Sequence, residues 1–247
     1  MKKSNIAILL SSLCVSCGPV VKHNYEIMSA ENIYKSAHEN MNKKNYHEAS
    51  EEFLEIEKQH PYSSLAIQGR LMAAYASFLE MKYANSTQIL NTFIAYHPTH
   101  KKIDYAYFLL GMSYLKQISS SERSSEHSKN ARDTFKLLCA KFPNSKYATE
   151  ARKKLNYLND LLANYEMNIG RFYQNNNNFI AAIPRFQNVI NSFFYTSLTP
   201  EAYYRIIESF LNLGMKNEAI ITQKQFLCAD NKNIWKIRAN ALIKNFK

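Results

Sequence analysis

The sequence predicts an all-α protein, an α-solenoid built from about five helix-turn-helix repeats. Small or apolar residues recur twelve positions apart, in the pairs Ala37 and Ala49, Ala74 and Ser86, Gly170 and Ala182, and Ile207 and Ala219. A small residue on one helix lets a second helix approach closely, and a bulky residue further on fills the space between neighbours. Prolines at 61, 98 and 143 end helices, which closes the early repeats.

Composition supports the same fold class. Apolar residues make up 46 % of the 247 residues, enough for a substantial core. Only five glycines and six prolines are present, fewer than a sandwich or barrel with many tight turns would need. Repeat arrays of this kind offer extended surfaces to other proteins.

The chain is basic, with a formal net charge of +11. A basic protein can bind nucleic acid, an anionic membrane or an acidic protein. The lysines and arginines form no dense block of five to eight residues, so they are interpreted as solvated helix faces. No nucleic-acid partner is expected.

Residues 1–16 resemble a lipoprotein signal peptide. Two lysines at positions 2 and 3 precede an apolar run over residues 6–13, which is too short to span a bilayer. We therefore expect export and removal of this segment.

Cys17 is the expected lipidation residue. Small side chains precede it at positions 15 and 16, as a lipoprotein signal-peptidase site requires, and residues 17–29 would form a lipidated tether. Cys14 is the alternative, but the bulky Leu13 stands immediately before it. A lipid on Cys17 would hold the protein at a membrane.

Residues 30–143 are interpreted as repeats one to three. Helices are expected over residues 30–43 and 46–59 in the first repeat, and over 65–79 and 84–96 in the second. The third begins at residue 102, with Gly111 at its small-residue position. Its next small residue, Ala131, comes twenty positions later rather than twelve, so the polar stretch 119–128 is interpreted as an inserted loop.

Residues 144–247 are interpreted as repeats four and five with a capping helix. No breaker interrupts residues 146–174, which predicts one long helix or two in near continuity. Its partner spans 179–193, where Pro184 must kink the helix or lie near its start. The fifth repeat is expected over 200–213 and 217–229. A cap over 233–247 would bury Trp235, Ile237 and Leu242.

The residue types argue against an enzyme, a metal site or a cofactor. His97 and His100 flank a proline instead of sharing a helix face, and no glycine-rich phosphate loop or nucleophile motif is present. Cys139 and Cys228 lie in separate repeats, which favours two buried thiols over a disulfide.

Tyr34 and Tyr75 are candidate substrate-binding residues. Both stand on predicted first helices, where an aromatic side chain would offer contact area and a polar tip to an extended peptide. Inter-helix core is the alternative for these residues, and it is favoured for Tyr105 and Phe108.

Two strings of residues resemble one family closely. The first is His97-Pro98-Thr99-His100 followed by Ile103-Asp104-Tyr105, and the second is Phe142-Pro143-Asn144-Ser145 with the long helix after it. Over roughly residues 30–220 the chain resembles the BamD family, the tetratricopeptide-repeat lipoproteins of the outer-membrane β-barrel assembly machinery.

The resemblance implies a tetratricopeptide-like, non-enzymatic scaffold, lipid-anchored at the periplasmic face of the outer membrane. It would bind BamA through its C-terminal repeats and receive unfolded outer-membrane β-barrel proteins near its N-terminal repeats, for insertion into the membrane. Pro200 stands where a family arginine that contacts BamA would align, so Arg185 and Arg205 are the candidates for that contact. The alternative is a periplasmic repeat lipoprotein that serves as an adaptor for cell-wall or division enzymes.

Overall fold

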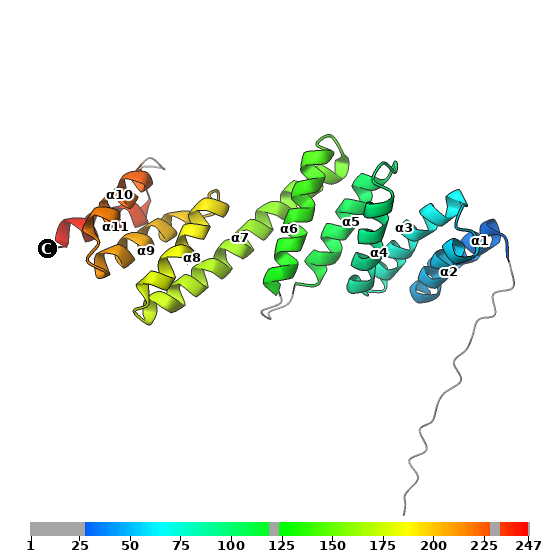
Figure 1. Cartoon of the computed structure of the whole chain (residues 1–247), viewed down its shortest axis with the longest axis horizontal. Helices are drawn as coiled ribbons and strands as arrows, with labels where there is room; N and C mark the ends of the chain where they lie inside the picture. Colours follow the sequence, from blue (N-terminus) through cyan, green and yellow to red (C-terminus); the bar gives the residue numbers. More distant parts are fainter. Residues whose placement is uncertain (1–27, 119–123, 228–232, 247) are drawn as a thin grey trace, which may run out of the picture.

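The computed structural model describes residues 28–118, 124–227 and 233–246, and within these ranges the chain is helical and contains no strand. The helices are α1 (Ala30–Asn42), α2 (Tyr46–Gln59), α3 (Ser64–Leu79), α4 (Tyr83–Tyr96), α5 (Ile103–Lys116), α6 (Ser124–Lys141), α7 (Lys146–Asn175), α8 (Phe179–Ser192), α9 (Thr199–Asn212), α10 (Lys216–Leu227) and α11 (Ile234–Asn245). Each helix packs against the next, and the array is elongated, with the N-terminal and C-terminal helices at opposite ends (Figure 1). The predicted all-α repeat fold is confirmed.

Polar side chains start several of the helices. The Ser29, Ser63 and Ser145 hydroxyls accept hydrogen bonds from backbone N–H groups in the first turns of α1, α3 and α7. Asn178 and Asn233 do the same for α8 and α11. Such caps satisfy donors that a helix leaves unpaired at its start. Ser63 and Ser145 follow Pro61 and Pro143 by two residues, so each proline turn leads directly into the next helix.

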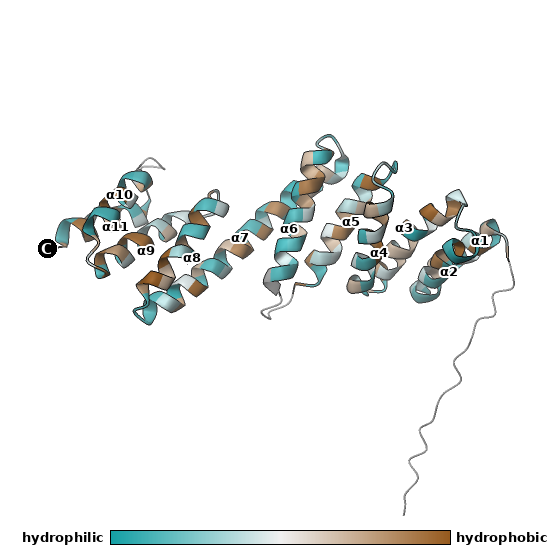
Figure 2. Cartoon of the chain, viewed as in Figure 1, coloured by the Kyte–Doolittle hydropathy of each residue, from teal (hydrophilic) through white to brown (hydrophobic). Residues whose placement is uncertain are grey.

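The small residues lie where the pattern predicts. Ala37, Ala49 and Ala74 are completely buried. Gly111 and Gly170 have the closest neighbours, because an added Cβ would lie 2.4 Å from a Phe135 ring carbon and 2.5 Å from a Phe186 ring carbon, respectively. Hydrophobic and hydrophilic stretches alternate along the helices, as expected when each helix buries only part of its surface (Figure 2).

Two details of the sequence interpretation are wrong. Part of the expected loop 119–128 is helical, because α6 already begins at Ser124 and Ser128 is buried; residues 119–123 lie outside the described residues. Ile237 is 66 % exposed, whereas Lys236 and Ala239 are buried and Trp235 and Leu242 pack partly against the C-terminal core. The buried face of α11 is therefore offset from the one expected.

The cysteines are only partly described. The Cys139 thiol is partly buried, with its Sγ 3.5 Å from the carbonyl oxygen of Ala148. Cys14, Cys17 and Cys228 lie outside the described residues. The expectations for lipidation and for a buried thiol at Cys228 stay predictions.

The first helix of the fourth repeat is a single helix of 30 residues, α7. Ala74 and Gly111 each stand thirteen residues after a proline, and Asn156 stands thirteen residues after Pro143. A second helix packs against Ala74 and against Gly111, whereas Asn156 is exposed. Helix α7 continues for several more turns to Gly170, where α8 packs against it. Thus α7 combines two first helices without a second helix between them.

Pro184 lies inside α8 as its sixth residue. It has no N–H to donate to the carbonyl of residue 180, so the helix forgoes one backbone hydrogen bond in its second turn. The division of the chain at residue 143 stays a prediction; the buried core itself separates within α7, between Leu158 and Leu162.

Candidate protein-binding surfaces

Tyr34 lies on α1 and is anchored at both ends of its side chain. Its hydroxyl oxygen is 2.6 Å from Gln68 Nε2 of α3, which donates to it, and its ring packs edge-on against Phe53 with 5.4 Å between centroids. Partial burial raises the pKa of the Tyr34 hydroxyl, and the Gln68 hydrogen bond opposes this only in part. The ring is partly covered, so it presents one edge rather than a free side chain.

Tyr75 belongs to a row of aromatic side chains along successive first helices. Its ring centroid lies 6.5 Å from that of Tyr105 on α5, which lies 5.2 Å from that of Tyr147 on α7. Phe108 stacks on Tyr147 with a centroid distance of 5.3 Å. Burial raises the pKa of Tyr105, and the neighbouring Tyr75 and Tyr147 hydroxyls raise it further. The structure thus joins Tyr75 to Tyr105, while no contact between Tyr34 and Tyr75 is seen among the described residues.

The two strings of residues that carry the family resemblance meet in space. Ser145 donates a hydrogen bond to the Asp104 carboxylate, with 2.7 Å between the oxygens. The Ser145 hydroxyl also caps α7, and Asp104 accepts from the backbone N–H of Tyr105. These contacts fix the turn before α7 against the first turn of α5.

Arg205 lies in an ionic cluster between α7 and α9. Arg171 makes two hydrogen bonds to Glu201, Nε to Oε1 at 3.0 Å and Nη2 to Oε2 at 2.7 Å. Arg205 donates to Glu201 at 3.3 Å and to Glu208 at 3.1 Å, and Gln174 donates to Glu208. This bidentate contact between Arg171 and Glu201 fixes the relative orientation of the two side chains in addition to pairing their charges.

The cluster controls the charge of Glu201. Burial raises the pKa of this carboxyl, but the hydrogen bonds and charges of Arg171 and Arg205 outweigh burial and hold the pKa below its usual range. Glu201 is only 8 % exposed, so the arginines keep a buried carboxylate ionised. Arg205 is therefore first of all part of the fold, with its guanidinium also near the Trp235 ring.

Arg185 occupies a separate place on α8. Its guanidinium lies 3.3 Å from the Glu166 carboxylate of α7, and 42 % of its side chain is exposed. No contact between Arg185 and Arg205 is seen within the described part of the chain. The two candidate arginines thus belong to two different ion pairs.

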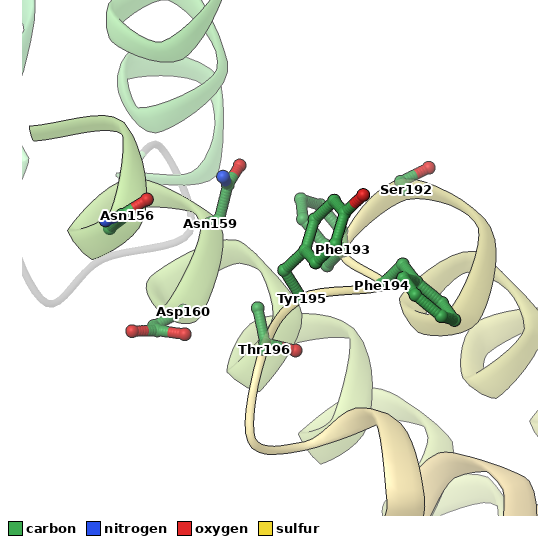
Figure 3. Close-up of a pocket in the computed structure, with 8 residues that line it drawn as sticks. All are labelled: Asn156, Asn159, Asp160, Ser192, Phe193, Phe194, Tyr195 and Thr196. Atoms are coloured by element: carbon green, nitrogen blue, oxygen red, sulfur yellow. The ribbon is translucent and has the colours of Figure 1, made fainter. Parts of the chain in front are cut away.

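A pocket opens between α7 and the turn that joins α8 to α9 (Figure 3). Asn156, Asn159 and Asp160 form one wall, and residues 192–196 form the other, around a volume of about 370 Å³. Tyr195 on the far wall is 98 % exposed. The pocket exists because no second helix packs at Asn156.

Arg132 of α6 ties the walls of this pocket together. It donates to Asn159 Oδ1 at 2.9 Å and to the carbonyl oxygen of Ser192 at 3.1 Å, and it lies over the Phe193 ring. Thr196 is buried, and its hydroxyl oxygen has no hydrogen-bond partner. The pocket therefore has a fixed frame and one unused polar group in its wall.

Among the described residues, no cluster of His, Cys, Asp and Glu is placed to hold a metal ion. None of the helices in these described ranges combines the length and the apolar composition that a membrane-spanning helix needs.

Comparison with known proteins shows a family match over most of the chain. The model of the YfiO family, described as an outer membrane lipoprotein, matches residues 26–225. The chain belongs to this family. The predicted resemblance is confirmed, and the matched range contains the aromatic row, the ionic cluster and the pocket.

Relatives of this chain carry the name outer membrane protein assembly factor BamD. One from Rickettsia prowazekii is 39 % identical over 211 residues, which cover 84 % of this chain and 82 % of the relative. One from Caulobacter vibrioides is 34 % identical over 216 residues, which cover 86 % and 71 %. The solved TPR2AB domain of yeast Sti1 aligns at a TM-score of 0.42 and 15 % identity, covering 87 % of this chain and 84 % of that one.

The sequence interpretation missed Tyr147, Glu166, Arg171 and Glu201. The spacing of Glu201 and Arg205, four residues apart on one helix, was a local signal for an ion pair. The contact of Glu201 with Arg171 joins two residues that are thirty positions apart in the chain, and no local periodicity of the sequence indicates it.

Proposed function

We propose that this protein is an outer-membrane protein assembly factor, a non-enzymatic scaffold lipid-anchored through Cys17 at the periplasmic face of the outer membrane. Its C-terminal repeats would bind BamA, and its N-terminal repeats would receive unfolded β-barrel proteins. Membership of the YfiO family and the names of the relatives support the assembly role.

The observation that carries the proposal is that two chemically different surfaces meet on one continuous helix, α7, which contributes Tyr147 to the aromatic row and Arg171 to the ionic cluster. The aromatic row on its N-terminal side offers apolar area with hydroxyl tips, which suits many different extended chains. The ionic cluster and the pocket on its C-terminal side are polar and fixed by several hydrogen bonds, which suits one folded partner.

Within the C-terminal surface, Arg185 is the better candidate for contact with BamA. Its side chain is more exposed than that of Arg205, and it is held by one ion pair instead of a cluster. Because much of its side chain is exposed, Arg185 can bind a carboxylate on a partner while it stays paired with the buried Glu166. Arg205 would act by supporting the surface.

The test is copurification of the full-length chain from detergent-solubilised envelopes. We expect Arg185→Glu to lose most of the bound BamA, while Lys153→Glu, an equally charged change at an exposed site on α7, retains it. Recovery of a cell-wall or division enzyme in place of BamA would favour the adaptor function instead.

Substrate contact is tested separately with a photo-crosslinking residue. Placed at Tyr34 or Tyr75, it should capture newly exported barrel proteins, whereas the exposed Tyr157 on α7 serves as the control site. Equal capture at all three positions would refute a dedicated N-terminal surface.

A further inference from the structure

The turns that join one repeat to the next lie along a single edge of the molecule, here called the joining edge. It comprises residues 60–63, 97–102, 142–145 and 193–198, which run along the upper side of Figure 1. The turns inside the repeats, residues 43–45, 80–82, 176–178 and 213–215, run along the opposite edge. The two edges differ in their chemistry.

Exposed aromatic side chains gather on the joining edge. Tyr62 is 101 % exposed and Tyr195 is 98 % exposed, and Tyr96, the last residue of α4, which directly precedes the turn 97–102, is 75 % exposed. Phe194 is 50 % exposed and packs only edge-on against Tyr195 among the ring contacts described. Tyrosine and phenylalanine with this exposure are typical of an interface that is apolar on one side and wet on the other.

The joining edge is also free of acidic residues. Its four turns contain no Asp or Glu, and Lys101 and Lys102 are exposed on it. Asp104, in the adjoining helical turn, is bonded to Ser145. On the opposite edge, Glu80 lies in a turn beside Lys82, and the turn residues include no aromatic side chain. Lysines beside exposed aromatics without carboxylates favour an anionic surface.

The N-terminal end of the described chain lies at the same edge. The carbonyl oxygen of Met28 is 2.6 Å from Nε2 of His60, two residues before Tyr62. Cys17 stands eleven residues upstream of Met28, and eleven residues reach at most about 40 Å when fully extended. A lipid on Cys17 would therefore hold a bilayer within about 40 Å of the joining edge.

We propose that the joining edge rests on the surface of an anionic phospholipid bilayer. Tyr62, Tyr96, Phe194 and Tyr195 would enter the headgroup region, and Lys101 and Lys102 would lie beside lipid phosphates. The proposal rests on the proposed lipid attachment at Cys17, and it adds a membrane contact to a function that otherwise concerns protein partners. It also fixes the orientation of the array, with its long axis along the membrane.

Depth of insertion tests the proposal directly. The purified full-length mature protein carries Trp235→Phe, so that the introduced tryptophan is the single source of tryptophan fluorescence. It is bound to vesicles of three parts phosphatidylethanolamine and one part phosphatidylglycerol, whose brominated acyl chains quench a tryptophan that enters the bilayer. We expect Tyr62→Trp and Tyr195→Trp to lose at least half of their fluorescence. Met81→Trp and Ile180→Trp, at sites that are 73 % and 74 % exposed near the opposite edge, should lose less than a tenth.

Charge reversal supplies the second arm. Lys101→Glu with Lys102→Glu should reduce the quenching at Tyr195→Trp at least twofold, and vesicles of phosphatidylcholine alone should do the same. Lys43→Glu with Lys44→Glu is the matched control on the opposite edge and should change nothing. Equal quenching at both edges, or none at the joining edge, overturns the proposal.

The mass of the N-terminal peptide reports separately whether Cys17 is acylated. If it is not, the anchor fails, and the comparison of edges on the unacylated protein still decides the bilayer contact. Failure of the assembly function would appear instead as unchanged barrel-protein levels in outer membranes after depletion of this protein.

Discussion

Replacing Gly111 by leucine tests how tightly the repeats are packed. Gly111 lies on α5 opposite Phe135 of α6, whose ring is completely buried. A Cβ at this position would lie 2.4, 2.7 and 2.7 Å from three ring carbons. Carbon atoms normally approach to about 3.5–4.0 Å, so the ring must retreat by about 1 Å even before the rest of the leucine is placed.

Two opposing effects set the magnitude. Overpacking a buried site costs about 1–3 kcal/mol, and leucine with its three further carbons belongs at the upper end. Removing a glycine from a helix returns about 1 kcal/mol. The net loss of unfolding free energy is therefore about 2 kcal/mol, which corresponds to a fall in melting temperature of about 4–8 °C for a domain of this size.

Thermal melting by circular dichroism measures the loss, with Asn156→Leu as the control. Asn156 has the same register after its proline as Gly111, but it is exposed, so leucine there should leave the melting temperature unchanged or slightly higher. Because repeat arrays open by neighbouring units, amide exchange should accelerate first in α5 and α6. Equal melting temperatures for the two variants would refute the packing argument.

Cys17→Ala should yield a chain whose N-terminal peptide carries no acyl group by mass spectrometry; a diacylated product would show that another residue is used. Glu201→Gln should reduce the unfolding free energy by about 1.5–3 kcal/mol at pH 7, because charged hydrogen bonds to Arg171 and Arg205 are lost. Since the folded-state pKa of Glu201 is lowered, its stabilisation is present above the ordinary carboxyl pKa and disappears as pH falls through the folded value. The melting temperatures of wild type and Glu201→Gln should therefore converge in acid, and a constant gap down to pH 2 would contradict this. Arg205→Ala should lower the melting temperature more than Arg185→Ala, because Arg205 pairs with the two carboxylates of Glu201 and Glu208, whereas Arg185 pairs with Glu166 alone; the reverse order would exchange their assigned roles.

Much of the fold could be predicted because its determinants are local and steric. Small residues twelve apart and a proline after each early repeat define where two helices meet, and Ala37, Ala49 and Gly111 lie in those places. For the Ser-rich stretch 119–128, this local reasoning predicted a loop where part of the chain is helical. Serine is a poor helix former, but α6 packs along both α5 and α7, and tertiary packing outweighs propensity from Ser124 onward.

The candidate site was harder to predict. Tyr75 joins Tyr105 and Tyr147 through helices that are adjacent only in the folded array, and charged residues such as Arg171 look like solvated surface in a sequence. The pocket depends on something missing from the pattern, a second helix at Asn156. The spacing of small residues predicts where a second helix packs. In a long helix without a helix-breaking residue, the sequence does not show the position at which a second helix is missing.

The continuous helix α7 has a consequence for the geometry of any assembly built on this protein. Its 30 residues extend about 45 Å, and each residue advances the helix by about 100° of rotation. Inserting a single residue between Leu158 and Leu162 would turn everything beyond it by more than a quarter of a circle relative to the first three repeats. The angle between the surfaces before and after this point therefore depends on the number of residues in α7, whereas a change of residue type at an exposed position of α7 leaves that angle unchanged.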